Sequence, residues 1–305
     1  MKILVTGGAG FIGSHLTDRL ITEGHSVVVV DNLSSGKKKN LHKEAVFYKA
    51  DILSSRLERI FAKEKPRMIF HYAAQIDVRK SVDDPVSDVT ANVIGLLNVL
   101  EAAVKSGGQR IIFSSSGGAI YGEQSVFPAT EEHPTHPLSP YGISKLASEH
   151  YLYYYQKVRG LESSVLRFAN VYGPRQDTLG EAGVVAIFAK KLLDGEQAII
   201  NGNGMQTRDY VYVEDVVDAN MAVINGNSRD TFNVGTGIET SVNDLFAALL
   251  KETQSKAKPF HGMEKKGEQR RSCVSAEKLH KMTGWEPRTS LAEGLARTVA
   301  HIKKS

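Results

Sequence analysis

Residues 1–31 read MKILVTGGAGFIGSHLTDRLITEGHSVVVVD, and this stretch decides the fold class. Two short runs, at 2–5 and 27–30, are apolar except for Lys2 and are typical of buried strands. Between them, apolar residues recur four apart from Ile12 to Leu20, as they do on one face of a helix. The order of these segments predicts a β-α-β unit at the start of the chain.

A glycine-rich loop, Gly7-Gly8-Ala9-Gly10-Phe11-Ile12-Gly13, joins the first predicted strand to the helix. Glycines let a backbone turn tightly and approach a pyrophosphate, whose negative charge the helix N-terminus attracts. A purely structural turn is the alternative, but Asp31 at the end of the second strand favours a dinucleotide site. The Asp31 carboxylate would repel the extra phosphate of NADP and so favours NAD. The lysines at 37–39 could argue for NADP, although a solvated loop explains them more simply.

Composition limits the class of protein. A chain of 305 residues can hold one large domain, or a nucleotide-binding domain and a smaller lobe. The formal charge of +4 comes from scattered Lys and Arg without a basic stripe, so we expect no nucleic-acid partner. The single Cys273 excludes an internal disulfide, and the chain has no CxxC or HExxH spacing, so we expect no metal site. We also expect no membrane span and a cytoplasmic location.

Strands and helices alternate to about residue 168 and become irregular after residue 170. Further strands are predicted at 46–49, 68–72, 110–113 and 164–168, and helices at 87–105 and 141–158. Later helices are predicted near Val184, Val216, Val242 and Ala276, with short strands near Ala198 and Tyr210. This order predicts an α/β fold, a doubly wound parallel Rossmann sheet with a smaller interleaved C-terminal substrate lobe. We assign 1–168 to the NAD-binding domain, with 210–235 returning to it, and 169–305 mostly to the substrate lobe.

Chemically useful side chains follow the central strands. Three serines, Ser114 to Ser116, end the strand at 110–113, where doubly wound sheets bind ligands. Tyr141 and Lys145 are four residues apart, which places both side chains on one face of a helix. Because an ordinary tyrosine pKa of about 10 makes a poor base at neutral pH, a neighbouring ammonium is needed to stabilise the phenolate.

Five motifs together resemble the extended short-chain dehydrogenase/reductases, and among them the UDP-glucose 4-epimerases. They are TGGAGFIG, DNLSSG, SSSGGAIYG, YGISK and RFANVYGPRQ, and the similarity covers nearly the whole chain. The resemblance implies an isomerase of carbohydrate (galactose) metabolism that uses NAD and a UDP-sugar. It also implies a homodimer formed through the helices at 87–105 and 141–158.

The resemblance assigns roles to three residues. It implies that Tyr141 is the acid/base, that Lys145 binds the nicotinamide ribose and lowers the pKa of Tyr141, and that Ser116 hydrogen-bonds the reacting hydroxyl. The SSSGGAIYG loop is one residue longer than the SSSATVYG form of the family, so Ser115 remains an alternative to Ser116. Family members that eliminate water or carbon dioxide carry acids where this chain has Gly117 and Gly118. The resemblance therefore favours an epimerase.

Further binding residues are implied by position. The expected cofactor contacts are Gly7, Gly10, Phe11, Ile12, Gly13, Asp31, Asn32, Ser34, Ser35, Gly36, Asp51, Ile52, Tyr72, Ala73, Ala74, Gln75, Asn92, Ser114, Tyr141 and Lys145. Tight packing is an alternative for the alanines, and satisfaction by nearby backbone is one for Asn92. The expected substrate contacts are Ser116, Tyr141, Asn170, Arg208, Lys265 and Glu268.

Several of these substrate contacts have alternatives. Arg208 could instead pair with Asp209 or Glu214. Lys265 stands where the family has a second arginine, a place that Arg270 or Arg271 could fill.

The expected reaction is inversion at C4 of a UDP-hexose, UDP-glucose or UDP-galactose, through a 4-keto sugar. Ser272 stands where the family limits the C2 substituent, and because serine is small, UDP-N-acetylglucosamine is expected to fit as well. Epimerisation of UDP-glucuronate is an alternative, with Gln75, Arg79 and Thr178 as candidate donors near C6. A non-catalytic NAD-binding regulator is another, although Tyr141 and Lys145 argue against it.

Overall fold

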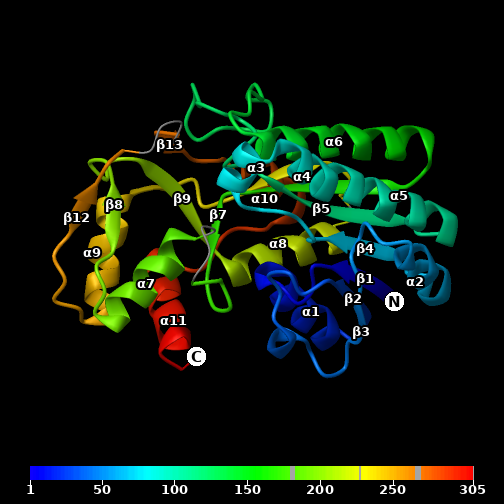
Figure 1. Cartoon of the computed structure of the whole chain (residues 1–305). Helices are drawn as coiled ribbons and strands as arrows, with labels where there is room; N and C mark the ends of the chain where they lie inside the picture. The colour runs from blue at the N-terminus through cyan, green and yellow to red at the C-terminus, as the bar shows by residue number, and fades with distance from the viewer. Residues whose placement is uncertain (179–182, 227, 265–268, 305) are drawn as a thin grey trace.

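A seven-stranded parallel sheet forms the centre of the larger lobe (Figure 1). The computed structural model describes residues 1–178, 183–226, 228–264 and 269–304. The strands lie in the order β10 (Thr231–Val234), β6 (Glu162–Phe168), β5 (Arg110–Ser116), β4 (Met68–His71), β1 (Lys2–Thr6), β2 (Ser26–Asp31) and β3 (Val46–Lys49). The strand order reverses between β1 and β4, which is where doubly wound sheets bind ligands. The predicted fold class is confirmed.

Helices cover both faces of this sheet because alternate side chains of each strand point to opposite faces. On one face, Ile3 and Val5 of β1 join a core with α1 (Phe11–Thr22) and α8 (Val213–Asn225). On the other face, Leu4 packs with α2 (Arg56–Glu64), α5 (Gly95–Ser106) and α6 (Pro140–Val158). A strand buried on both sides is therefore apolar at every position, as the VVVV run of β2 is.

The helix predicted at 87–105 forms in the structure as three consecutive segments. It begins as α4 (Pro85–Val89), with Asp84 accepting a hydrogen bond from Ser87 N at 2.9 Å, continues as a π-helical turn at Thr90–Ile94, and ends as α5. Gly107 stops it in the left-handed conformation at φ +79°. The predicted helix and its end are therefore confirmed, and the π-turn within it is a detail that periodicity does not reveal.

The same segment bears on one expectation about membranes. Residues 85–106 are long and apolar enough to cross a membrane by length and composition alone. Half of the apolar window is buried inside the protein, as in the core helix of a globular domain. The packing of α5 against α2 and α6 accounts for this apolar run, and the expectation of no membrane span stays a prediction.

A smaller lobe carries short strands and three helices. Its four-stranded sheet contains β7 (Asn170–Tyr172), β9 (Thr207–Tyr212), β11 (Glu239–Ser241) and β13 (Arg271–Ser272), and a separate pair joins β8 (Ile199–Asn201) to β12 (Phe260–Gly262). A third core packs α7 (Val184–Asp194), α9 (Val242–Thr253) and α11 (Leu291–Lys304) against these strands. The remaining helices are α3 (Val78–Asp83), α10 (Glu277–Thr283) and a 3₁₀ turn at Lys38–Asn40.

Sequence patterns did not reveal several of these elements. They missed α11 and the strands from β10 to β13, of which β11, β12 and β13 have only two or three residues each. Runs that short contain no detectable period. In space, α8 and β10 belong with the large sheet, whereas β9 belongs to the small one.

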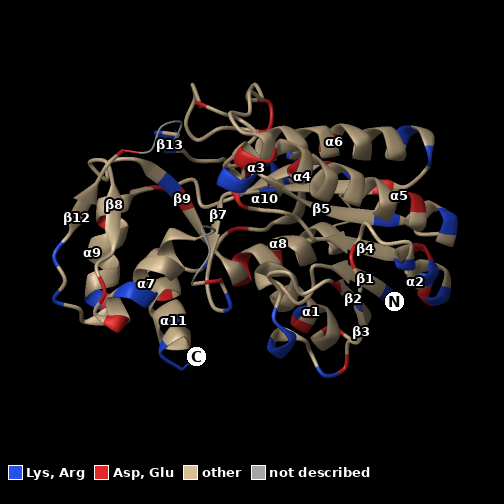
Figure 2. Cartoon of the chain, in the orientation of Figure 1, with Lys and Arg blue, Asp and Glu red and all other residues tan. Residues whose placement is uncertain are grey.

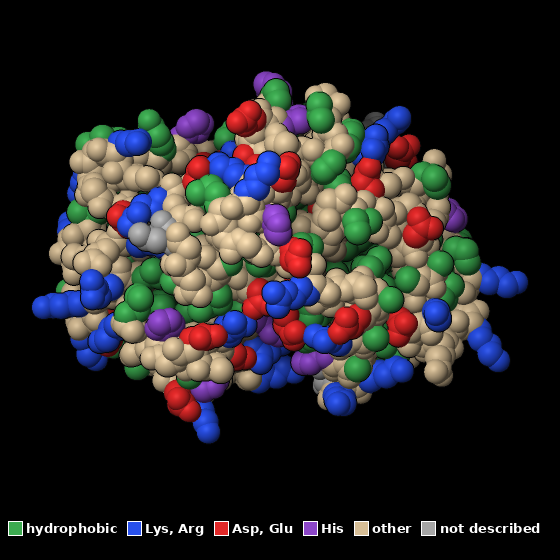
Figure 3. All heavy atoms as spheres, turned by 180° about the vertical axis from the view of Figure 1, so that it is seen from behind, with side chains coloured by type: hydrophobic (Ala, Val, Ile, Leu, Met, Phe, Trp, Pro, Cys, Tyr) green, Lys and Arg blue, Asp and Glu red, His purple; other side chains and the backbone are tan. Residues whose placement is uncertain are grey.

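Surface charge is mixed. Lys and Arg lie among Asp and Glu over both lobes in Figure 2, and the face seen from behind in Figure 3 mixes the two signs in the same way.

Candidate active site

The glycine-rich loop packs more closely than any side chain would allow. A Cβ on Gly7, whose φ is +70°, would lie 2.6 Å from Ala73 N, and one on Gly13 would lie 2.3 Å from Gly7 O. At Gly10 the nearest heavy atom to such a Cβ is Gly7 O, at 3.1 Å. Gly10 is also the N-cap of α1. Because glycine has no side chain, it offers the first N–H groups of the helix no side-chain acceptor. This is the arrangement that binds a pyrophosphate.

Asp31 closes the other end of this cradle. Its carboxylate accepts hydrogen bonds from Ala9 N at 2.9 Å and from Leu33 N at 2.7 Å. A Cβ on Gly36 would come within 2.9 Å of Asp31 Oδ1, so only glycine lets this loop approach the carboxylate. A carboxylate has about four acceptor positions, so Asp31 keeps capacity for ribose hydroxyls. The residues present therefore fit a dinucleotide.

Other predicted cofactor residues lie around this cradle. Phe11 and Ile12 begin α1, and Ser34 and Ser35 lie exposed after β2. Asn32 Nδ2 donates to Asp51 Oδ2 at 2.8 Å, which joins the loops after β2 and β3. Ile52, next to Asp51, is buried.

Two of the predicted contacts have other partners in the structure. The hydroxyl of Tyr72 donates to Asn220 Oδ1 at 2.8 Å and its ring stacks on Phe168, so the side chain belongs to the core. Asn92 Oδ1 accepts from Gln75 N at 2.9 Å, and its Nδ2 donates to Gln75 O at 3.0 Å. Nearby backbone therefore satisfies Asn92, as the alternative explanation predicted, and these bonds hold the loop after β4. Its own contact with a cofactor stays a prediction.

The three serines at the end of β5 have different partners, and because a strand alternates its side chains, Ser115 lies on the face opposite to Ser114 and Ser116. Ser114 Oγ donates to His71 O at 3.1 Å. Ser115 Oγ donates to Glu149 Oε1 at 2.5 Å. Ser116 interacts with the Tyr141 hydroxyl, and this interaction favours the phenolate. The structure thus places Ser116, and not Ser115, beside the predicted acid/base.

Tyr141 and Lys145 lie on the first turns of α6, which begins where Ser139 Oγ accepts from Gly142 N at 3.1 Å. Lys145 is only 4% exposed, and its Nζ donates to Ser114 O at 2.8 Å. The same ammonium lies 5.7 Å from the centre of the Tyr141 ring and 4.8 Å from that of Phe113. The predicted pair therefore shares one buried site.

Burial dominates the electrostatics of this pair. Burial raises the pKa of Tyr141 to about 12, although the hydrogen bond from Ser116 opposes the rise. Burial also lowers the pKa of Lys145 to about 8. Desolvation of the phenolate is thus the largest effect on Tyr141, and a lowering of its pKa by Lys145 stays a prediction.

Two buried acids near the pair were missed by the sequence analysis. Asp88 of α4 and Glu149 of α6 both raise the pKa of Lys145. Glu149 is paired with Arg167 at 2.6 Å, and both side chains are 9% exposed. The available signals were weak: Glu149 follows Lys145 by one helical turn, and Asp88 is an acid on an otherwise apolar segment.

Gly118 opens a space on the other side of Ser116. A Cβ at this position would lie 3.6 Å from Asn170 Oδ1, 3.9 Å from Ser272 Oγ and 4.0 Å from Ser116 Oγ. Three polar groups from β5, β7 and β13 therefore surround one glycine.

Arg208 lies near this space, since its backbone pairs with that of Ser272 between β9 and β13. Its Nη1 donates to Thr207 O at 2.7 Å. Asp209, a suggested ion partner of Arg208, accepts from Thr236 N and Gly237 N instead. Glu214, the other suggested partner, pairs with Arg297.

Two predicted substrate contacts, Lys265 and Glu268, lie outside the described residues. Arg271, an alternative to Lys265, pairs with Glu239 at 2.5 Å and covers the ring of Phe127. Its guanidinium is thus already used at the protein surface.

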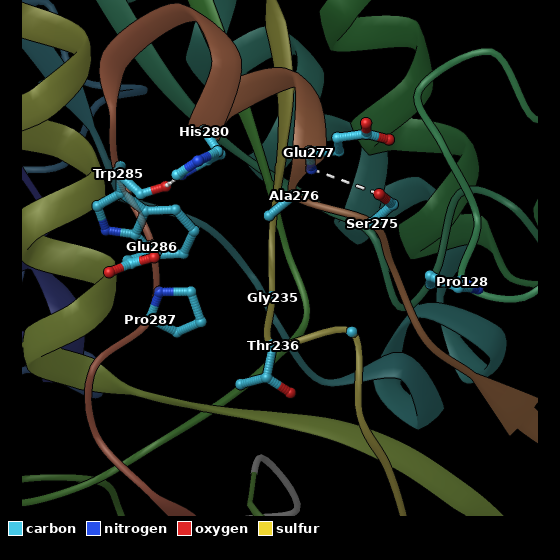
Figure 4. Close-up of a pocket in the computed structure, with 11 residues that line it drawn as sticks. Pro128, Gly235, Thr236, Ser275, Ala276, Glu277, His280, Trp285, Glu286 and Pro287 are labelled. Atoms are coloured by element: carbon cyan, nitrogen blue, oxygen red, sulfur yellow. Dashed lines mark hydrogen bonds between the residues drawn. The ribbon is translucent and has the colours of Figure 1, made fainter.

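A pocket of about 300 Å³ lies outside this cluster (Figure 4). Its lining includes Gly235, His280, Trp285 and Pro287, and none of the predicted site residues. Among the described residues, no three His, Cys, Asp or Glu side chains gather as metal ligands would. The candidate site is therefore defined by the convergence of side chains around Ser116 and not by cavity size.

Comparison with known proteins agrees with this geometry. Residues 3–235 match the model of the NAD dependent epimerase/dehydratase family. A UDP-glucose 4-epimerase of Mycolicibacterium smegmatis is 46% identical over 99% of both chains. The crystal structure of a Thermotoga maritima UDP-glucose 4-epimerase with UDP-glucose is 50% identical, with a TM-score of 0.98 over 100% of this chain and 99% of the other.

A Thermus thermophilus UDP-glucose 4-epimerase in complex with NAD is 41% identical, with a TM-score of 0.95 over all of both chains. The resemblance inferred from the motifs is confirmed. With its glycine cradle, its Tyr141–Lys145 pair and a family match over three quarters of its length, the chain belongs to the NAD-dependent epimerase/dehydratase family.

Proposed function

We propose that the protein inverts the configuration at C4 of a UDP-hexose in an NAD-dependent reaction that passes through a 4-keto sugar. The observation that carries this proposal is the convergence of Ser116, Tyr141 and Lys145 at the carboxyl end of β5, with Gly118 leaving room beside them. The UDP-glucose 4-epimerases named above support the substrate class. The glycine loop and Asp31 would hold the cofactor, and the groups around Gly118 would hold the sugar.

Tyr141 is the group that moves the proton. It takes the proton of the 4-hydroxyl as the keto sugar forms, and it returns a proton to O4 after the sugar has presented its other face. Ser116 hydrogen-bonds the same oxygen and keeps it directed at Tyr141. Hydride acceptance from C4 and its later return are the chemistry that NAD supplies when it is bound.

Lys145 and Tyr141 act as one acid-base unit because the ammonium lies 5.7 Å from the centre of the Tyr141 ring. The first proton leaves this pair near pH 8, which is the pKa of Lys145. The singly deprotonated pair can hold its remaining shared proton on nitrogen, which gives a phenolate beside an ammonium. That form is the base the reaction needs, and both groups protonated give no base.

The absence of side chains at Gly117 and Gly118 favours simple re-reduction. Relatives that act on C5 or C6 are expected to carry acids at these positions, and the two glycines offer no side chain there to remove a proton from C5. The keto sugar therefore has hydride return as its remaining outcome.

The UDP-glucuronate alternative is weakened by the structure. Gln75, one of its candidate donors near C6, already donates from Nε2 to Asp77 O and Asp88 Oδ1, each at 2.9 Å. Its Oε1 accepts from Asp77 N at 2.6 Å. Gln75 is thus used to hold its own loop.

We also infer a homodimer, because apolar side chains line the outer faces of two adjacent helical segments. Ile143, Tyr151 and Tyr154 are exposed on α6, with the spacing of one helix face. Val82 and Val86 are exposed on α3 and α4, which pack against α6. Exposed apolar side chains on neighbouring helices are typical of a protein interface.

Replacement of Tyr141 by Phe is expected to reduce turnover at least ~10³-fold, because the proton of the 4-hydroxyl then has no acceptor. The measurement is formation of C4 epimers from a panel of UDP-sugars, followed by NMR. Tyr121→Phe is the matched control, because it removes the hydroxyl of another buried tyrosine, one that bonds Asn233 and Arg167. Unchanged turnover in Tyr141→Phe would rule out the assigned role.

The value of kcat/KM is expected to rise with pH and level off above an apparent pKa of about 8, because protonation of both Tyr141 and Lys145 removes the base. In Lys145→Met this limb should disappear from the neutral range, since the remaining phenol has a pKa of about 12. A limb near pH 8 that persists in Lys145→Met would contradict the coupling of the pair.

Wild-type enzyme is expected to accept UDP-N-acetylglucosamine beside UDP-glucose, because Ser272 is small and faces the space at Gly118. Ser272→Tyr should lower the ratio of kcat/KM for the acetylated sugar to that for UDP-glucose by ~10-fold or more. Ser272→Ala should leave this ratio unchanged. An equal ratio in Ser272→Tyr would show that Ser272 does not limit the C2 substituent.

The chain is expected to sediment with twice the mass of one subunit. Val86→Glu and Ile143→Glu, at side chains 72% and 56% exposed, should yield monomers because each buries a charge in the interface. Met282→Glu on α10, 49% exposed, is the control that should stay dimeric. Monomeric wild-type protein would refute the inferred assembly.

A further inference from the structure

A buried carboxylate lies where three elements meet next to the candidate catalytic pair. Asp88 of α4 is 1% exposed. Its Oδ2 accepts a hydrogen bond from Ser144 Oγ of α6 at 2.7 Å. Its Oδ1 accepts from Asn92 Nδ2 in the π-turn at 3.0 Å and from Gln75 Nε2 in the loop after β4 at 2.9 Å. One carboxylate thus joins α4, α6 and the β4 loop, and Figure 1 shows α4 beside α6.

This arrangement suits an anion held in a fixed place. An ionised carboxylate only accepts hydrogen bonds, and each oxygen of Asp88 receives at least one donor. Ser144 directly precedes Lys145, so the bond from its hydroxyl ties the turn of α6 that carries the ammonium to α4. The π-turn brings Asn92 to the same carboxylate, and such turns are frequent at functional sites.

The charged and titratable groups around Lys145 come from several elements. On α6 itself lie Tyr141 and Glu149, and Glu149 is shared with Arg167 of β6 at 2.6 Å. From β4 comes His71, whose pKa is lowered to about 3 by burial and by Lys145, so the imidazole is neutral. From α4 comes Asp88. Because Arg167 offsets the charge of Glu149, Asp88 is the main anion acting on the ammonium.

We propose that Asp88 is a positioning residue, whose buried carboxylate fixes the first turns of α6 against the β4 loop and keeps Lys145 an ammonium beside Tyr141. The importance of this for turnover rests on the proposed function of the pair. Asp88 itself touches neither the sugar nor the reacting atoms in this account. It acts through Ser144, Gln75 and its charge.

The sign of the effect follows from the charge. The carboxylate raises the pKa of Lys145 and that of Tyr141, so a neutral side chain in its place lowers both. The first proton then leaves the pair at lower pH, whichever of the two groups releases it. A purely structural role for Asp88 would weaken turnover at every pH without moving this titration.

The test uses Asp88→Asn, which keeps an oxygen acceptor for Asn92 and Gln75 but removes the charge. The Lys145 side chain is titrated by NMR in protein with ¹³C-labelled lysine, and its signal is assigned by its loss in Lys145→Met. Its pKa is expected near 8 in the wild type and lower by about one unit in Asp88→Asn. Ser144→Ala is the matched control, because it removes one hydrogen bond and keeps the carboxylate.

The acid limb of kcat/KM should move to lower pH by the same amount in Asp88→Asn and stay in place in Ser144→Ala. An unchanged or raised Lys145 pKa in Asp88→Asn would overturn the proposal, as would a uniform loss of turnover with an unmoved limb. If Asp88→Asn does not fold, Asp88→Ser is titrated under the same criteria. The NMR titration needs no substrate, so an inactive wild type would refute the proposed function while the titration still decides the role of Asp88.

Discussion

A buried ammonium is the constraint on which the site depends. Taking Lys145 out of water disfavours its charge, and the structure offsets that cost from several directions. The carbonyl of Ser114 accepts one of its protons, the face of Phe113 lies 4.8 Å away, and two carboxylates from α4 and α6 raise its pKa. Three of these four partners come from β5 and α6, the elements that also carry Ser116 and Tyr141. The stability of one charge and the geometry of the reaction are therefore set by the same contacts.

The topology of the sheet brings these groups together. Parallel strands end at one edge, so the glycine loop after β1, the β4 loop and the serines of β5 face the same side. α6 then adds Tyr141 and Lys145 beside β5, and the small lobe adds Asn170 and Ser272 across Gly118. The cofactor cradle and the space for the sugar meet at Ser116, because residues of both lobes lie beside the end of β5.

Part of this arrangement could be predicted from the sequence. The strands at 2–5 and 27–30 are apolar at positions 3–5 and 27–30 because both of their faces are buried there, and the spacing of Tyr141 and Lys145 is local to one helix. Partnerships across long separations left no pattern, as in the bond between Asp88 and Ser144, 56 residues apart. The effect of burial on the Tyr141 pKa was missed for a similar reason, since desolvation depends on the whole surrounding fold.

The central claim is that one hydroxyl of a UDP-sugar meets both Ser116 and Tyr141. A crystal structure of the protein with NAD and UDP-glucose tests this most directly. The account predicts that the 4-oxygen lies within about 3.2 Å of both Tyr141 Oη and Ser116 Oγ, with the nicotinamide ring facing C4. A sugar whose 4-oxygen contacts neither group, or a ring separated from C4 by protein, would contradict it.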